Sequence, residues 1–192
     1  MAQVTSTTPT FSALRCGPIV LHLITKENLD AVRQRFADHS DAEYLPKELN
    51  KSYVPRYDEN GRRTKWGFYA VLDDEVAGLS LLGISSWERL SGYTGADTLT
   101  HMRGRGVAPG SKRHLFYLGF ALLGLNRIET GCSPANVASR RAIEKVPGFV
   151  FEGVLRENGR TETGDFEDEL RYAILRRDWS RLYNASTVEL IE

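Results

Sequence analysis

Two glycines in a basic turn, followed by a long apolar segment, constrain this chain more than any other feature of its sequence. The turn covers residues 103–108, Arg-Gly-Arg-Gly-Val-Ala, and the apolar side chains of residues 111–124 fall on more than one side of a helix. A helix that is apolar on most of its surface is a buried one, packed against a sheet. The sequence therefore predicts a layered α/β domain with the glycine turn just before its buried helix.

The glycine turn is typical of an anion-binding loop. Glycine has no Cβ and tolerates positive φ, so backbone N–H groups in the turn can come close to a ligand. The free N–H groups and positive dipole end of a following helix favour a phosphate. Spacing excludes two related motifs: a dinucleotide fingerprint needs glycine where Pro109 stands, and a P-loop needs Gly-Lys-Ser/Thr where the chain has Gly110-Ser111-Lys112. Taken alone, the turn is also compatible with a basic patch of surface.

The remaining patterns supply a sheet for this helix. Asp73-Asp74 is a turn signal between two β-rich runs, Thr25 suits a helix N-cap, and Pro134 suits a first helical position. Residues 38–65 hold prolines and charges and predict a helical turn or two within a loop that covers a substrate cleft. Strands are expected at 19–24, 66–72, 75–87, 92–100, 127–132, 149–155 and 170–176, and helices at 25–36, 111–124 and 136–146, with a polar loop at 158–164.

Length and composition limit the classes of protein. A chain of 192 residues with 41% hydrophobic residues is most simply one domain, expected at 13–179 between a disordered tail at 1–12 and a C-terminal extension at 180–192. Lysine plus arginine equal aspartate plus glutamate at 25 each, which argues against nucleic acid as the partner. No apolar run approaches the roughly 20 residues of a membrane span, and the first ten residues are no secretory signal. With only two cysteines, the chain is expected to have neither a disulfide framework nor a zinc site. A cytoplasmic location is expected.

A second set of motifs lies downstream of the turn. It consists of Gly124-Leu125-Asn126-Arg127-Ile128-Glu129, Asn136-x-x-Ser139, Ile143-Glu144-Lys145, Gly148-Phe149-x-x-Glu152-Gly153-x-Leu155-Arg156 and the closing run at 172–179. With Arg103, Gly106 and Ala108, which meet the pattern Gln/Arg-x-x-Gly-x-Gly/Ala, these motifs resemble the GNAT superfamily of acyl-CoA-dependent N-acetyltransferases. More narrowly they resemble its RimJ/RimL-type branch, named for enzymes that acetylate the N-termini of ribosomal proteins. The resemblance is close in the second half of the chain and loose at 21–29.

The resemblance implies a fold and a cofactor. The fold is a mixed, mostly antiparallel central sheet flanked by helices, in which two parallel central strands splay apart and hold the pantetheine arm between them. The co-substrate is acetyl-CoA or a longer acyl-CoA, attacked directly by an amine with no metal and no covalent intermediate. The expected cofactor-binding residues are Leu99, Arg103, Gly104, Arg105, Gly106, Val107, Ala108, Asn136 and Ser139.

Each expected residue has a task in acyl transfer. Backbone amides of the turn hold the pyrophosphate, with charge added by Arg105, Lys112 or Arg113. A strand bulge near Leu99 exposes an N–H that polarises the thioester carbonyl. Asn136 contacts the pantetheine arm, and Ser139, three residues further on the same helix face, stabilises the leaving thiolate. Asn136 and Ser139 are also compatible with an ordinary polar first turn of a helix.

The base that deprotonates the amine is assigned to Asp97 or His101, which flank the splayed strand. Glu88 and the carboxylates of 165–169 are alternatives, and His101 is also compatible with a solvated surface position. The acceptor is an amine of a protein N-terminus or of a small molecule. Relatives often form homodimers through sheet edges or final strands, so a homodimer is considered as well.

Two other functions remain open at this stage. One is a non-catalytic acyl-CoA-binding module, because Leu99-Thr100-His101-Met102 replaces the Asp-Pro-type turn usual before the arginine. The other is RNA binding by the basic turn, which neutral overall charge disfavours. The segment 145–149 also carries one residue more than the usual pattern, which would shift the last strands relative to the cofactor.

Overall fold

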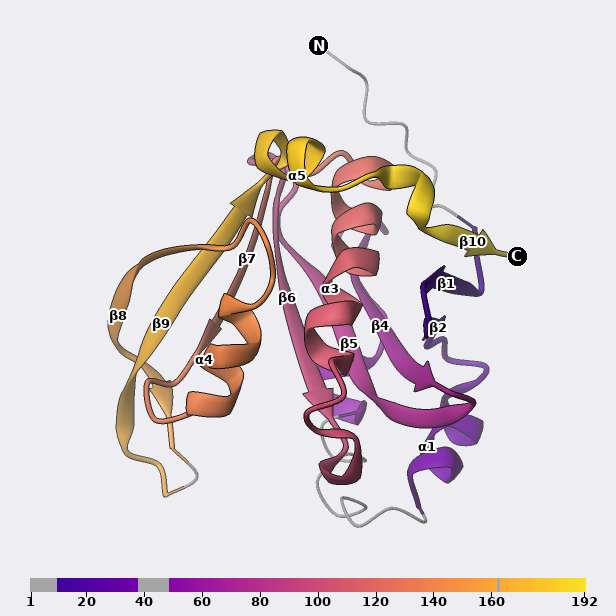
Figure 1. Ribbon diagram of the computed structural model, residues 1–192, viewed down its shortest axis with the longest axis horizontal. Coiled ribbons are helices and arrows are strands. Elements are labelled where there is room, and N and C mark those ends of the chain that lie inside the picture. Colours follow the sequence, from indigo (N-terminus) through magenta and orange to yellow (C-terminus); the bar gives the residue numbers. More distant parts are fainter. Residues whose placement is uncertain (1–9, 38–48, 162) are drawn as a thin grey trace.

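A single mixed sheet forms the centre of the protein (Figure 1). The computed structural model describes residues 10–37, 49–161 and 163–192. The strands within these ranges are β1 (Ala13–Cys16), β2 (Ile19–Leu23), β3 (Arg56–Tyr57), β4 (Arg63–Leu72), β5 (Glu75–Ser86), β6 (Ser91–Thr98), β7 (Arg127–Cys132), β8 (Val150–Arg160), β9 (Phe166–Leu175) and β10 (Glu189–Ile191). Their order in the sheet is β10-β1-β2-β4-β5-β6-β7-β9-β8, with β3 paired to β4.

The two central strands β6 and β7 run parallel and then separate. Their ladder pairs Ser91 with Arg127, Gly92 with Ile128 and Tyr93 with Glu129, whereas β6 continues to Thr98 and β7 to Cys132. Figure 1 shows the two strands side by side at their starts and diverging towards their ends. The other strand pairs in the described residues are antiparallel. The predicted fold class, including the splay between two parallel strands, is confirmed.

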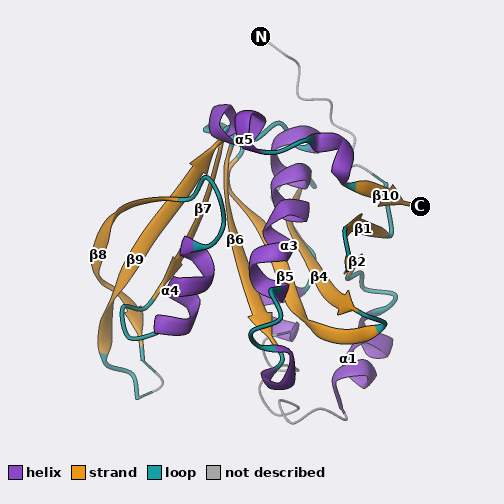
Figure 2. Cartoon of the chain, in the orientation of Figure 1, coloured by secondary structure: helices purple, strands orange, loops and turns teal. Residues whose placement is uncertain are grey.

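Helices cover both halves of the sheet (Figure 2). The helical segments are α1 (Leu29–Ala37), η1 (Leu49–Tyr53), η2 (Thr100–Met102), α3 (Val107–Phe116), η3 (Tyr117–Leu122), α4 (Val137–Glu144), α5 (Arg176–Leu182) and η4 (Ala185–Thr187). Helix α3 and its continuation η3 contribute Leu115, Phe116, Leu118 and Phe120, all fully buried, to the main core. The predicted buried helix is confirmed, although it begins at Val107 rather than at 111.

The Pro109-Gly110 pair fits this earlier helix start. Pro109 is the third residue of α3, where a backbone N–H would have no acceptor within the helix. Gly110 lies against β2, and a Cβ at this position would overlap Cδ1 of Ile19. The buried His114 adds a second contact to the same strand, because its Nε2 lies 3.0 Å from the Ile19 carbonyl oxygen. Glycine therefore weakens the helix locally but lets β2 pack closely on it.

Several predicted boundaries need correction. Helix α4 begins after Asn136, not at Pro134, because the Asn136 side chain caps the helix by accepting the Ser139 N–H. Strand β8 extends to Arg160 and β9 starts at Phe166, so residues 158–160 of the polar loop expected at 158–164 belong to a strand. Strand β4 begins at Arg63 rather than at 66.

Both ends of the chain join the sheet beyond the expected domain limits of 13 and 179. Strand β10 pairs antiparallel with β1, and the Ser12 N–H donates to the Ile191 carbonyl. Phe11 is buried and stacks on Phe68. Residues just before 13 and a segment ending at Ile191 therefore contact the sheet, where short strands gave no periodic signal in the sequence.

Part of the segment expected as a loop at 38–65 is core. Residues 38–48 lie outside the described residues, but Leu49 and Tyr53 of η1 are 1% and 2% exposed. Gly67 of β4 allows η1 to approach, since a Cβ there would overlap the Tyr53 carbonyl oxygen. Two apolar residues four apart on one helical turn were too short a pattern to predict this packing.

Candidate active site

The glycine turn has the geometry of an open anion-binding loop. Gly104 and Gly106 both have φ of +80°, which disfavours any residue with a Cβ, and no heavy atom lies within 4 Å of the position of such a Cβ. Gly106 is the N-cap of α3 and has no side chain to accept the first N–H groups. The amides of Val107 and Ala108 are thus at an uncapped helix N-terminus with a positive dipole end. The positive φ explains why both residues are glycine, and the open space around them leaves room for an external anion.

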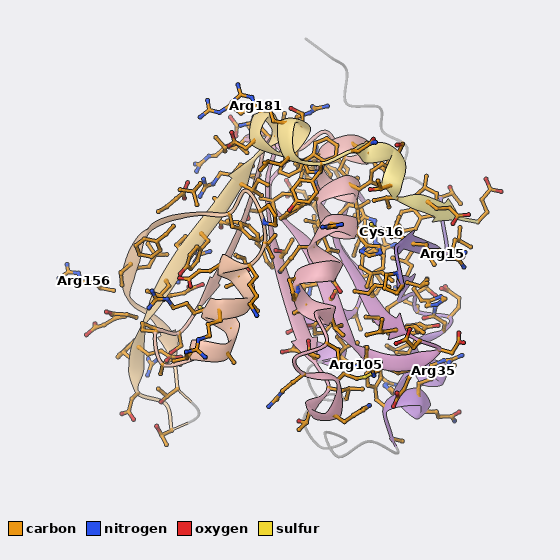
Figure 3. All side chains as sticks on the ribbon, viewed as in Figure 1. Arg15, Cys16, Arg35, Arg105, Arg156 and Arg181 are labelled. Atoms are coloured by element: carbon orange, nitrogen blue, oxygen red, sulfur yellow. The ribbon has the colours of Figure 1, made fainter. Side chains whose placement is uncertain are left out.

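The charges around the turn differ from those expected. Arg105 donates to Asp73 at 2.8 Å and lies 3.9 Å from Glu75, so its guanidinium is held by the β4–β5 hairpin. Figure 3 shows Arg105 beside the ribbon of the turn, at the end of the molecule where β6 terminates. Lys112 is buried and directed away from the turn, which corrects its assignment to the pyrophosphate. Arg113 lines a separate cleft of about 230 Å³ with Lys145.

The expected bulge at Leu99 is not observed. The Leu99 N–H donates to the Ala77 carbonyl oxygen at 3.0 Å, and β6 keeps a regular register with β5 from Gly92 to Thr98. The register shift of this pair lies instead opposite the start of β6, between Ile84 and Ser86. Because N–H directions alternate along a strand, the amides of Ala96 and Thr98 point towards β7, where the parallel ladder has ended. These amides, rather than that of Leu99, face the splay.

Asn136 and Ser139 come together at the other side of the splay, after β7. The Asn136 Oδ1 accepts the Ser139 N–H at 3.0 Å and fixes the first turn of α4. Burial raises the pKa of the thiol of Cys132, the last residue of β7, and the Ser139 hydroxyl acts on this pKa in the opposite direction. The half-buried Ser139 hydroxyl therefore lies where β7 has already parted from β6.

The two expected bases have different surroundings. Asp97 of β6 accepts a hydrogen bond from the buried Tyr53 hydroxyl at 2.6 Å. Its side chain points to the sheet face opposite α3, because Thr94, three residues earlier, contacts α3. His101 lies outside the splay: its Nε2 is 3.0 Å from Oε1 of the exposed Glu75 at the start of β5. The structure thus places Asp97, and not His101, on the strand that lines the splay.

The alternative carboxylates are dispersed. Glu88 is in the β5–β6 turn, at the opposite end of β6 from Asp97. Asp168 accepts the Glu157 N–H within the β8–β9 hairpin. Glu169 is the exception, because its Oε1 approaches Gly131 of β7. Among the carboxylates of 165–169, Glu169 is therefore the one that reaches the splayed strand.

An ion-pair network lies on one face of the three neighbouring strands β7, β9 and β8. Glu129 lies 3.2 Å from Arg171 and 3.4 Å from Arg127, while Arg171 also binds Glu169 at 3.0 Å. Arg127 donates to Glu152 at 2.7 Å, which lowers the pKa of that carboxyl. Of these residues, Arg127, Glu129, Glu152 and Arg171 line a cleft of about 430 Å³. Ile128 packs on Gly119 of η3, so its neighbour Glu129 points to the face opposite the helix, the face of Asp97.

A buried polar cluster at the start of the splay was missed by the sequence analysis. The Lys112 Nζ donates to the Thr94 Oγ1 at 2.8 Å, and the Thr130 Oγ1 donates to the Thr94 carbonyl oxygen at 3.0 Å. Desolvation lowers the pKa of Lys112 to about 7, while the negative charge of Asp97 acts in the opposite direction. The spacing of Lys112 to Leu115 and Phe116 would have placed it on the apolar helix face.

Two further properties concern the described residues alone. Within residues 10–37, 49–161 and 163–192, no group of three or more His, Cys, Asp or Glu side chains is arranged to hold a metal ion. No helix in this part of the chain has both the length and the apolar composition to cross a membrane.

Comparison with known proteins gives a family match for most of the chain. The acetyltransferase (GNAT) domain matches residues 19–150. A similar curated protein is an uncharacterised N-acetyltransferase, p20, of Bacillus licheniformis, which is 27% identical over 145 residues, covering 76% of this chain and 78% of the relative.

Solved structures show the same fold. The spermidine N-acetyltransferase of Vibrio cholerae in complex with CoA and spermine aligns with a TM-score of 0.63 and 18% identity over 85% of this chain and 98% of that chain. A GNAT-family acetyltransferase of Bacillus anthracis aligns with a TM-score of 0.62 and 20% identity over 86% and 99% of the two chains. At these identities, the structural similarity establishes the fold alone.

Proposed function

This chain belongs to the acetyltransferase (GNAT) domain family, and from that membership we propose that it transfers an acetyl group from acetyl-CoA to a cationic amine on the Asp97 side of the sheet. One observation carries the proposal: the β6–β7 ladder stops after Tyr93 and Glu129, and an open glycine turn follows the end of β6. The splay offers backbone amides to a pantetheine arm, while the turn offers amides to its pyrophosphate.

Each residue of the candidate site has one task in the proposed reaction. The amides of Val107 and Ala108 hold the pyrophosphate, and those of Ala96 and Thr98 bind the arm and polarise the thioester carbonyl. Asp97, oriented by Tyr53, accepts a proton as the amine attacks. The C–S bond of the thioester then breaks, and the Ser139 hydroxyl donates a hydrogen bond to the leaving sulfur. Acetyl-CoA supplies the activated acyl group, and a longer acyl-CoA is the second donor to test.

The charges on the acceptor side favour a cation. Glu129 and Glu169 both pair with Arg171, Arg127 and Glu152 balance one another, and the Asp97 carboxylate lies on the same face. The carboxylates of such a surface attract an ammonium ion. Spermidine, the amine named for the Vibrio cholerae neighbour, is a reasonable first acceptor to test. The RimJ/RimL-type motifs at 136–156 support a protein N-terminus as the second.

Binding and turnover test this function separately. Calorimetric titration with acetyl-CoA measures the cofactor site, and release of free CoA thiol measures transfer. The acceptors are spermidine, a free amino acid and a peptide with a free N-terminus, with the N-acetylated peptide as the matched control. We expect acetyl-CoA binding and thiol release with spermidine. Binding without thiol release for any amine would instead identify a non-catalytic acyl-CoA-binding protein, and no binding would contradict the proposal altogether.

Ser139→Ala tests the role of the serine at the leaving group. We expect kcat to fall about tenfold with an unchanged KM for acetyl-CoA, because one hydrogen bond formed with the developing thiolate is lost. Ser133→Ala is the control, since the Ser133 hydroxyl caps the Ala135 N–H in the same segment. Equal kcat values for the two variants would remove Ser139 from the mechanism.

We also propose that the protein forms a homodimer through the β8 edge. Strand β8 ends the sheet, and the apolar side chains along it and at the start of β9 are 41–60% exposed; they are Val150, Phe151, Val154, Leu155 and Phe166. An edge strand with exposed apolar residues favours pairing with another strand. In light scattering we expect Val154→Lys to shift the mass towards a monomer, whereas Leu182→Lys, on the exposed surface of α5, leaves it unchanged. A monomeric wild type would contradict this interface.

A cytoplasmic location is part of the same proposal. Cys16 and Cys132 are both free thiols, which is the usual state in a reducing compartment.

A further inference from the structure

Lys112 is a charged residue in an unusual place. It lies on α3 with 5% of its surface exposed, and its only hydrogen-bond partner among the described residues is the Thr94 hydroxyl. Thr94 is the first residue of β6 beyond the parallel ladder, and Thr130 is the corresponding residue of β7. The Thr130 hydroxyl bridges the two strands at the Thr94 carbonyl. Lys112, Thr94 and Thr130, here called the splay clasp, therefore connect helix α3 to both strands where they part.

Burying the ammonium group of Lys112 in the splay clasp costs folding free energy. A buried ammonium has three N–H donors, and a single hydroxyl does not replace the water that it loses. The lowered pKa of Lys112 has this desolvation as its first cause. An apolar side chain of similar length would fill the space between α3 and β6 without this cost. Retaining a lysine in such a position is typical of a residue that serves a site at the expense of stability.

We propose that Lys112 is a positioning residue for acyl-CoA: through Thr94, the splay clasp fixes the point at which β6 and β7 separate and so the depth to which the acyl-pantetheine arm enters. This inference rests on the proposed acetyltransferase function. The amides of Ala96 and Thr98 lie two and four residues beyond Thr94 on the same strand edge. A shift of the β6 backbone at Thr94 therefore moves both amides relative to the thioester.

The first test compares cofactor affinity with stability in Lys112→Met. Methionine has a similar length and no charge, so we expect the thermal midpoint to rise or stay equal while the KM and Kd for acetyl-CoA increase about tenfold. A residue with a merely structural role would give the reverse, a lower midpoint and an unchanged KM. Lys65→Met is the matched control, because Lys65 of β4 is also buried, burial likewise lowers its pKa, and it makes no contact with the splay clasp. We expect its KM to equal that of the wild type.

Urea denaturation at several pH values tests whether the ammonium is buried as described. The folded-state pKa of Lys112 is about 7, below its usual 10.5, so between these values the unfolded chain binds more protons than the folded one. The free energy of unfolding of the wild type therefore increases with pH in this window relative to Lys112→Met. If the free energy of unfolding changed with pH in the same way in both proteins, the Lys112 side chain would not be buried, and the proposal would be overturned.

A double-mutant cycle with Thr94→Val tests whether Lys112 acts through Thr94. Valine keeps the shape of threonine and removes the hydroxyl, so we expect a KM increase similar to that of Lys112→Met and no further increase in the double variant. Independent, multiplying effects would contradict the splay clasp. These outcomes differ from failure of the proposed function: if the wild type binds no acetyl-CoA, the enzyme proposal fails, whereas equal binding by the wild type and Lys112→Met overturns the positioning role alone.

Discussion

Replacing Gly106 with aspartate is expected to weaken acetyl-CoA binding by about 100-fold or more. The new carboxylate would stand at the N-cap of α3, where it would accept the first helical N–H groups itself and repel the pyrophosphate. Two unit charges about 4 Å apart near a protein surface interact with about 4 kcal/mol, and each 1.4 kcal/mol is a factor of ten in affinity. Solvent exposure of the turn reduces this repulsion, which is why the expected loss is nearer 100-fold. Calorimetric titration with acetyl-CoA and CoA measures the effect.

Two controls separate charge from backbone strain. Gly106→Asn has nearly the same shape as the aspartate variant and the same strain at φ of +80°, so we expect it to bind acetyl-CoA about tenfold more tightly than Gly106→Asp. Gly124→Asp introduces a carboxylate at another glycine of positive φ with open space around it, at the far end of the helix, and should bind as the wild type does. Equal affinities for Gly106→Asp and wild type would show that no anion is held at the turn.

Asp97→Asn is expected to lower kcat by about 100-fold while acetyl-CoA still binds. The amide is nearly isosteric with the carboxylate and still accepts a hydrogen bond from the Tyr53 hydroxyl, so the fold at the contact between β6 and η1 is kept. What is lost is the proton acceptor on the face where the amine approaches. Initial rates at saturating acetyl-CoA, with spermidine as the varied acceptor, measure the change.

The kcat of Asp97→Asn is compared with the kcat of two further variants, Tyr53→Phe and His101→Gln. Tyr53→Phe removes the hydrogen bond that orients Asp97 and should lower kcat about tenfold. His101 is bound to Glu75 outside the splay, and we expect the kcat of its variant to stay within about twofold of the wild type. A larger loss for His101→Gln than for Asp97→Asn would move the base to His101 and contradict the present assignment.

The strong local patterns predicted the elements that form the site. The alternation at 75–87 and 127–132, the apolar helix after the turn and the two glycines at 104 and 106 lie where the structure has β5, β7, α3 and an open loop. Such features can be predicted because they depend on period and on backbone conformation, which neighbouring residues specify. Short strands such as β1 and β10 have too few residues for a period, and they form because they pair with each other across the length of the chain.

The candidate site was harder to predict than the elements that bear it. Leu99 was assigned an exposed amide, yet its N–H pairs with Ala77, because the register of β6 against β5 decides which amides are free. Lys112 was assigned to a phosphate, yet the rotation of α3 turns it inward to Thr94. Both differences depend on how two elements pack, which a motif in one segment cannot specify.

The sequence by itself determined the layered α/β class, the position of the glycine turn at a helix start and the resemblance to acyl-CoA-dependent transferases. These properties are local, since periodicity, the absence of a Cβ and motif spacing depend on residues that are close together in the sequence. Only the tertiary structure decided that Tyr53 meets Asp97, that Glu129 meets Arg171 and that Lys112 lies buried beside Thr94. These contacts join segments up to 44 residues apart, and their geometry is fixed by strand register and helix packing around one common core.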